Sequence, residues 1–224
     1  MTNHLNYSVK PKTQYKYYTL LACMYVTIMV ASTTVAYKPV QIGPFTATAS
    51  SLLFACTFAI SSIIAEVYGR KTSKTLIWIV IPCGLLFTIL ITGLSHLPSP
   101  ADWNKQAAFN YVLGSSMRFA AFGTVGSIIS YHINIYLITK WKFLTSGKYF
   151  TLRTIGANSF GEFFLVAITT FGAFSGVYPT REVISIFAFA YISKIFFSFI
   201  LAWPSALIAT ITKKRERLDV YDAA

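Results

Sequence analysis

Long apolar stretches alternate with short polar connections along the whole chain. Each apolar stretch is long enough to cross the hydrocarbon core of a bilayer, which takes about 20 helical residues. The pattern therefore predicts six membrane-spanning helices, near residues 17–37, 45–66, 75–97, 108–139, 152–173 and 183–212.

The connections between these stretches, such as residues 69–74 and 98–107, are too short to form a second domain. The composition agrees, because 55% of the residues are hydrophobic and only 12% are charged, against about 25% charged in a soluble domain. We expect an all-α polytopic membrane protein with one transmembrane domain over residues 17–212, an N-terminal tail over 1–16 and a C-terminal tail over 213–224. Two homologous halves of three helices each would have opposite orientations, as in transporters built from 3+3 inverted repeats.

The cations lie in alternate connections, and this distribution predicts the orientation. By the positive-inside rule, both termini are cytoplasmic. The net charge of +12 is then explained by topology and by contact with anionic membrane lipid, with no nucleic-acid partner. The cations assigned to the cytoplasmic side are Lys10, Lys12, Lys16, Arg70, Lys71, Lys74, Lys140, Lys142, Lys148, Arg153, Lys213, Lys214, Arg215 and Arg217, against Lys38, Lys105 and Arg181 on the other side.

Three charged residues remain inside the predicted spans: Arg118, Glu162 and Lys194. Each lies about ten residues from one end of its span, and at 1.5 Å per residue this places it near the bilayer centre. A charge there costs about 2.5–3.5 kcal/mol on the more lenient scale, so it faces a bundle interior or a wet cavity and usually has a function. One interpretation is an Arg118–Glu162 ion pair that only holds helices together, which would leave Lys194 without an acid partner. We favour a lined cavity in which a ligand or a coupling ion balances the additional positive charge.

Other polar side chains accompany these charges. Asn158 lies four residues before Glu162, so the two share one helix face, and Tyr191 lies three residues before Lys194 on one face of the last span. At the cytoplasmic end of the second span, Glu66 precedes a basic turn, which we expect it to hold or to gate. Gly69 in the same run fits a C-terminal helix cap.

The sequence contains no recognisable catalytic or metal-binding motif. H-E-x-x-H, a P-loop and a clustered-aspartate motif are all missing. Ser127 and His132 could not act together as a hydrolase pair, because five residues on one helix place them about 140° apart. Cys23, Cys56 and Cys83 are isolated, with no metal-ligand spacing. We therefore expect neither enzymatic activity nor a cofactor.

The run Glu66-Val67-Tyr68-Gly69, followed by basic residues, resembles the queuosine precursor transporter family. This family consists of six-span proteins of the bacterial inner (cytoplasmic) membrane, once described as vitamin uptake transporters. The resemblance extends over about residues 15–215 and departs from the family's usual acids at Ser62, Ser130 and Gly161. The other residues that carry it are Arg118 in the fourth span, Arg153, Thr154 and Asn158 in the fifth, and Tyr191, Lys194 and Pro204 in the last.

The resemblance implies import of 7-cyano- or 7-aminomethyl-7-deazaguanine, or a related base, for tRNA modification. A guanine-like edge offers two N–H donors that a carboxylate accepts together, and Glu162 is the first candidate for this contact, with Glu66 the second. Asn158 would read the carbonyl edge, and Arg118 or Lys194 would act as a donor. An aromatic side chain would stack on the ring, and the candidates near the polar residues are Phe54, Phe163, Tyr191 and Trp203.

We therefore expect a carrier for a small planar precursor that works by facilitated diffusion or with an ion gradient. The alternative is a substrate-binding membrane subunit of a vitamin-type transporter that is energised by a separate ATPase module. The sequence leaves a homo-oligomer open.

Overall fold

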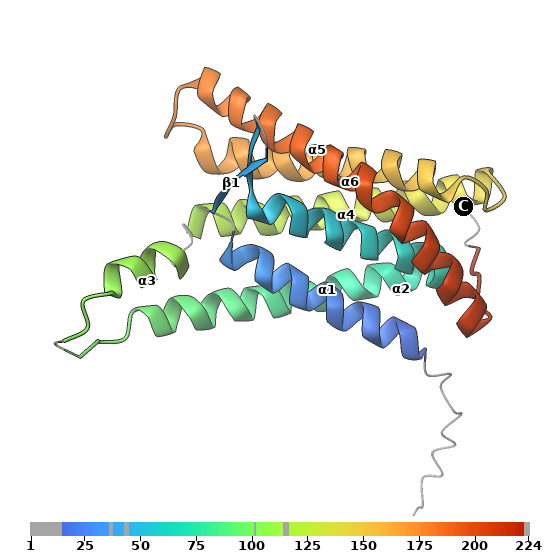
Figure 1. Ribbon diagram of the computed structural model, residues 1–224, viewed down its shortest axis with the longest axis horizontal. Coiled ribbons are helices and arrows are strands. Elements are labelled where there is room, and N and C mark those ends of the chain that lie inside the picture. The colour runs from blue at the N-terminus through green and yellow to red at the C-terminus, as the bar shows by residue number, and fades with distance from the viewer. Residues whose placement is uncertain (1–14, 36–37, 43–44, 101, 114–116, 222–224) are drawn as a thin grey trace, which may run out of the picture.

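The computed structural model describes residues 15–35, 38–42, 45–100, 102–113 and 117–221. The described part is a bundle of long helices with one small hairpin (Figure 1), which confirms the all-α polytopic fold class. Within it, five helices are long and apolar enough to cross a membrane: α1, α2, α4, α5 and α6. In chain order the elements are α1 (Lys16–Thr34), β1 (Pro39–Ile42), β2 (Phe45–Thr48), α2 (Ala49–Ser95), α3 (Gln106–Leu113), α4 (Met117–Leu144), α5 (Phe150–Phe174) and α6 (Thr180–Glu216).

Helix α2 is a helical hairpin with its turn at Gly69. As a straight helix its 47 residues would extend about 70 Å, more than twice a bilayer core. At Gly69 the backbone has φ 83° and ψ 176°, a conformation that is essentially restricted to glycine. The chain reverses there (Figure 1). The first arm of α2 (residues 49–68) and the second arm (70–95) therefore supply two of six membrane-length segments.

The structure corrects several predicted boundaries. The predicted loop over 69–74 is wrong, because helix resumes directly after Gly69. Residues 45–48 are a strand that pairs antiparallel with residues 39–42, where the sequence analysis began the second span. Threonine, valine, isoleucine and phenylalanine favour such extended backbone.

The predicted fourth span is divided into α3 and α4. The boundary predicted for the C-terminal tail, at residue 213, lies inside α6, which continues to Glu216.

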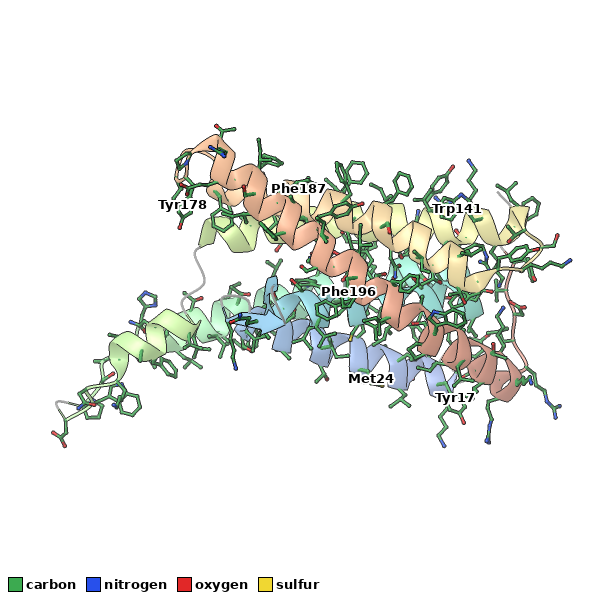
Figure 2. The ribbon with its side chains drawn as sticks, turned by 45° about the horizontal axis from the view of Figure 1, so that its top comes forward. Tyr17, Met24, Trp141, Tyr178, Phe187 and Phe196 are labelled. Atoms are coloured by element: carbon green, nitrogen blue, oxygen red, sulfur yellow. The ribbon has the colours of Figure 1, made fainter. Side chains whose placement is uncertain are left out.

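Large apolar side chains project outward from the helices, as expected where lipid is the solvent. Met24 on α1 and Phe196 on α6 are 45% and 54% exposed (Figure 2), and Ile89 on the second arm is 68% exposed. The interior is packed around the first arm of α2, where Phe58 and Ile64 are completely buried.

One end of the bundle, which we call the basic end, joins five segments. It contains the start of α1, the α2 turn, the end of α4, the start of α5 and the end of α6. The Tyr17 backbone N–H donates to Glu216 Oε1 at 2.7 Å, which connects α1 with α6. Lys142 of α4 donates to the Glu66 carbonyl of α2, and Arg153 of α5 donates to the Glu66 carboxylate. The sequence predicts that this end faces the cytoplasm.

Candidate functional site

A cavity of about 350 Å³ lies in the half of the bundle away from the basic end. Its position follows from its lining, which comes from the last turn of α1, the first turns of α2, the end of α5 and the first turns of α6. A volume of this size falls in the range of small-molecule sites. Its lining includes Ser32, Ser50, Phe54, Thr124, Thr170 and Lys194.

The cavity lining combines hydroxyl groups with apolar surface. Serine and threonine residues from α1, both arms of α2, α4 and α5 face it, and Lys194 is the one charged side chain among its described lining residues. Lys194 is only 7% exposed. Its Nζ lies 4.5 Å from the centroid of the Phe54 ring, within the range of a cation–π contact. Lys194 and Phe54 therefore form one continuous part of the wall.

Behind Lys194 lies Glu162, the acid that balances its charge. Lys194 Nζ is 3.1 Å from Glu162 Oε2, and Glu162 is completely buried and does not line the cavity. Its Oε1 has no hydrogen-bond partner among the described residues. The interpretation that left Lys194 without an acid partner is wrong, because Glu162 and Lys194 pair with each other.

Arg118 stands in the first turn of α4, not ten residues into a continuous helix. Its side chain lies outside the described residues, so its role stays a prediction. Tyr191 lies on α6, about one helical turn before Lys194. Its hydroxyl donates to the Ser159 carbonyl at 3.3 Å, and its ring stacks on Phe187 with the centroids 5.9 Å apart.

Asn158 joins four segments between the cavity and the basic end. Its Oδ1 accepts hydrogen bonds from Ser62 Oγ at 3.0 Å and from Asn134 Nδ2 at 2.8 Å. Its Nδ2 donates to Ser198 Oγ at 2.9 Å. The first arm of α2 and helices α4, α5 and α6 therefore share one buried amide, which is 1% exposed. Ser62, where the family resemblance predicts an acid, is part of this network.

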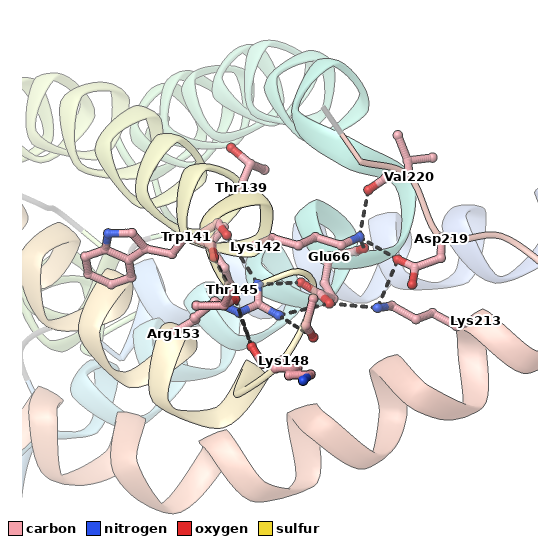
Figure 3. Close-up of polar contacts among 12 residues, drawn as sticks. Glu66, Thr139, Trp141, Lys142, Thr145, Lys148, Arg153, Lys213, Asp219 and Val220 are labelled. Atoms are coloured by element: carbon pink, nitrogen blue, oxygen red, sulfur yellow. Dashed lines mark hydrogen bonds and ion pairs between the residues drawn. The ribbon is translucent and has the colours of Figure 1, made fainter. Parts of the chain in front are cut away.

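Glu66 is the centre of an ion-pair cluster at the basic end (Figure 3). Arg153 Nη1 and Nη2 donate to its two carboxylate oxygens at 2.8 and 3.2 Å, a two-point contact that suits the planar guanidinium. Lys213 Nζ adds a third bond at 2.7 Å. Glu66 is 2% exposed and Arg153 3%. The expectation that Glu66 holds the adjacent basic turn is wrong, because its partners come from α5 and α6.

The segment after α6 folds back onto this cluster. Lys142 is 2% exposed and donates to the Glu66 carbonyl, to Asp219 Oδ1 and to the Val220 carbonyl (Figure 3). The Val220 N–H donates to the Val67 carbonyl at 3.2 Å. Burial acts to raise the pKa of Asp219, but hydrogen bonds from Lys142 and Lys213 outweigh it and lower that pKa below its ordinary value.

Sequence reasoning assigned Arg153, Lys142 and Lys213 to the cytoplasmic face as topology signals and missed their shared role. All three are charged residues at the ends of apolar spans, where charge usually faces water. One signal could have suggested the cluster. Glu66 lies on the apolar side of its basic turn, and an acid in that position needs a buried partner.

The fold and cavity together define a class: a polytopic α-helical membrane protein with a small-molecule-sized site between its helices. Residues 48–208 match the family described as "Putative vitamin uptake transporter". The chain belongs to this family of membrane transporters. It is 23% identical over 158 residues to the "Probable queuosine precursor transporter" of Bacillus subtilis (strain 168), an alignment that covers 70% of this chain and 69% of the relative. No solved structure matches the chain significantly.

Proposed function

We propose that this transporter imports a 7-deazaguanine precursor of queuosine, and that the cavity above Lys194 is its binding site. The proposal is supported by the similarity to the Bacillus subtilis relative, which is named a probable queuosine precursor transporter, and by the chemistry of the cavity. The observation that carries it is the buried Glu162–Lys194 pair at the inner end of a cavity of about 350 Å³. Charges inside a membrane cost free energy, so a buried charge pair beside a cavity usually has a function.

The residues take the following roles. Lys194 donates to the carbonyl edge of the base. Phe54, which lies against Lys194, stacks on the flat face of the base. Glu162, the first candidate for the N–H edge in the sequence, lies behind Lys194 and would hold its ammonium toward the cavity. Of the four aromatic candidates, Phe54 is favoured because it lines the cavity, whereas Phe163 is 42% and Trp203 66% exposed on the outside of the bundle.

We assign the remaining candidate site residues to the route of the substrate through the protein rather than to the cavity wall. Asn158 lies one helical turn before Glu162 on α5, on the side of the basic end. It would receive the base as the base moves toward that end. Arg118 stays a candidate donor to the base, and Tyr191 would hold α6 against α5 through the Ser159 carbonyl. Glu66 is engaged by Arg153 and Lys213, and we assign it to the closed cytoplasmic gate.

The protein thus adopts an outward-facing state in the bacterial inner membrane, with both termini in the cytoplasm. The cavity lies in the half of the bundle away from the basic end, while the basic end is closed by the Glu66 cluster and by the Asn158 network. Release to the cytoplasm requires these contacts to separate, as in alternating access around a site near the membrane centre.

Uptake by cells that cannot synthesise queuosine precursors tests the proposal. Expression of the protein should restore queuosine in tRNA when the precursor is supplied in the medium. Phe54→Leu should reduce uptake about tenfold, because stacking of a base on an aromatic ring contributes about 1–3 kcal/mol. Phe196→Leu is the matched control, since Phe196 is 54% exposed on the outer surface, and it should leave uptake unchanged. No restoration at any precursor concentration would contradict the proposed substrate.

A further inference from the structure

The charged group that the cavity presents to its ligand is a lysine ammonium, and its balancing carboxylate lies behind it. Lys194 is the one charged side chain among the described lining residues. The chain has only seven acids, so the sequence limits what could offset that charge. Glu162 is the single acid inside the membrane-spanning part, apart from Glu66 at the basic end. The remaining acids are Asp102, Glu182, Glu216, Asp219 and Asp222.

Glu162 neutralises Lys194 from the side opposite to the ligand. The carboxylate is completely buried, does not line the cavity and approaches Nζ to 3.1 Å. The Phe54 ring holds the same Nζ on another side, at 4.5 Å. A ligand that enters the cavity therefore meets the ammonium first, and the carboxylate only if the pair is broken.

The two 7-deazaguanine precursors differ in charge at the position that would distinguish them. A nitrile substituent is neutral, and its nitrogen accepts a hydrogen bond. An aminomethyl substituent carries a primary amine, which is protonated near neutral pH as the lysine side chain is. Two like charges facing each other in a poorly hydrated site cost several kcal/mol.

We propose that the cavity selects a neutral planar base with a hydrogen-bond acceptor toward Lys194, and thus the 7-cyano form over the cationic 7-aminomethyl form. This inference rests on the proposed function and adds the substrate charge to it. The serine and threonine hydroxyls of the lining, such as Ser50 and Thr124, can contact either ligand and do not discriminate by charge.

Competition for uptake tests the selectivity. Cells that express the protein take up labelled 7-cyano-7-deazaguanine in the presence of unlabelled 7-cyano, 7-aminomethyl or 7-hydroxymethyl compound. The 7-hydroxymethyl compound is the matched control, because it has nearly the size of the aminomethyl compound and no charge. We expect the 7-cyano and 7-hydroxymethyl compounds to compete at least about tenfold better than the aminomethyl compound, as like-charge repulsion requires.

The double variant Glu162→Lys/Lys194→Glu exchanges the pair and inverts the charge that faces the cavity. It should reverse the preference, so that the aminomethyl compound competes better. Lys194→Gln removes the charge and should narrow the wild-type preference to about threefold or less, since only differences in hydrogen bonding remain. If the double variant does not reach the membrane, the wild-type competition and Lys194→Gln still decide the question.

The possible failures are distinguishable. Equal or better competition by the aminomethyl compound in the wild-type protein would overturn the charge selectivity and leave the transport proposal intact, because uptake would still be observed. Such a result would mean that the ligand separates Lys194 from Glu162 and pairs its amine with the carboxylate. Absence of uptake of both the labelled 7-cyano and the labelled 7-aminomethyl compound would overturn the proposed function, and the selectivity with it.

Discussion

Arg153 and Lys213 converge on a single carboxylate, that of Glu66, and this convergence determines what each residue contributes. Arg153 also donates to the carbonyls of Lys148 and Gly147, so its guanidinium is hydrogen-bonded even without the acid. Its charge, in contrast, is compensated mainly by Glu66. A buried pair of this kind adds little net stability compared with apolar packing, but removal of one partner is costly because a buried charge is left behind.

The substitution Glu66→Gln tests this at the residue scale. It keeps the size and one acceptor and removes the charge that Arg153 and Lys213 share. The free energy of unfolding should fall by about 3 kcal/mol, the lower end of the range for breaking a buried pair. Denaturation of the purified protein in mixed detergent micelles measures this. Glu182→Gln, at an exposed acid in the first turn of α6, should change the free energy by less than about 0.5 kcal/mol; equal effects of both substitutions would contradict the role of the cluster.

At the scale of elements, the α2 hairpin depends on one backbone conformation. The turn consists of Gly69 alone, with helix before and after it. Because the two arms cross the membrane in opposite directions, the position of this turn decides which residues of each arm reach the basic end. Glu66, three residues before the turn, is thereby directed toward α5 and α6.

Gly69→Ala should destabilise the protein by about 1–3 kcal/mol, since alanine must adopt a backbone conformation that is essentially restricted to glycine. Gly93→Ala is the matched control in the second arm of the same helix. A Cβ at Gly93 would meet no heavy atom within 4 Å, so this substitution should be neutral or slightly stabilising through helix propensity. Unfolding of both variants in detergent provides the comparison. A neutral Gly69→Ala would contradict the constraint on the turn.

The segment after α6 is held by a titratable group, so its attachment depends on pH. The folded-state pKa of Asp219 is lower than its ordinary value. Its contribution is therefore fully present above about pH 4, the unfolded value, and is lost as the pH falls through the lowered pKa. Hydrogen exchange of the Val220 N–H, which bonds to Val67, should accelerate over that range relative to its intrinsic rate. In Asp219→Asn the relative rate should be high already at pH 7 and should not change with acid; a pH dependence that persists would assign the effect to another group.

At the scale of the whole molecule, the cavity and the Glu66 cluster occupy opposite halves of the bundle. The chain also contains no P-loop that could bind a nucleotide. Under the proposed function, we expect transport by exchange between arrangements that open one half at a time, with the substrate gradient or an ion gradient as the driving force.

Reconstitution tests this directly. The purified protein alone, in liposomes of anionic lipid, should mediate uptake of labelled 7-cyano-7-deazaguanine without ATP. Glu66→Gln weakens the cytoplasmic closure and should increase the share of molecules that open inward, which alters the rate of exchange more than the affinity. Uptake that requires an added ATPase module would instead favour the alternative of a substrate-binding subunit.

Much of the architecture could be predicted from the sequence, because a bilayer imposes a length and an apolar composition on every spanning segment. Helix boundaries that depend on a single residue were harder to predict from the sequence. The turn at Gly69 was predicted as a loop of six residues, since a basic run normally lies outside the membrane, whereas the structure continues it as helix. The division into α3 and α4 was missed because residues 108–139 were read as one span, despite the polar residues within it.

The sequence by itself determined the membrane-spanning class and the presence of interior charges at Glu162 and Lys194. Hydrophobicity and charge are properties of each residue and act at a known depth. Only the tertiary structure decided the partners, pairing Lys194 with Glu162 and Glu66 with Arg153. An ion pair depends on how helices distant in the chain are rotated and packed against one another, and the composition of a single helix does not contain that information.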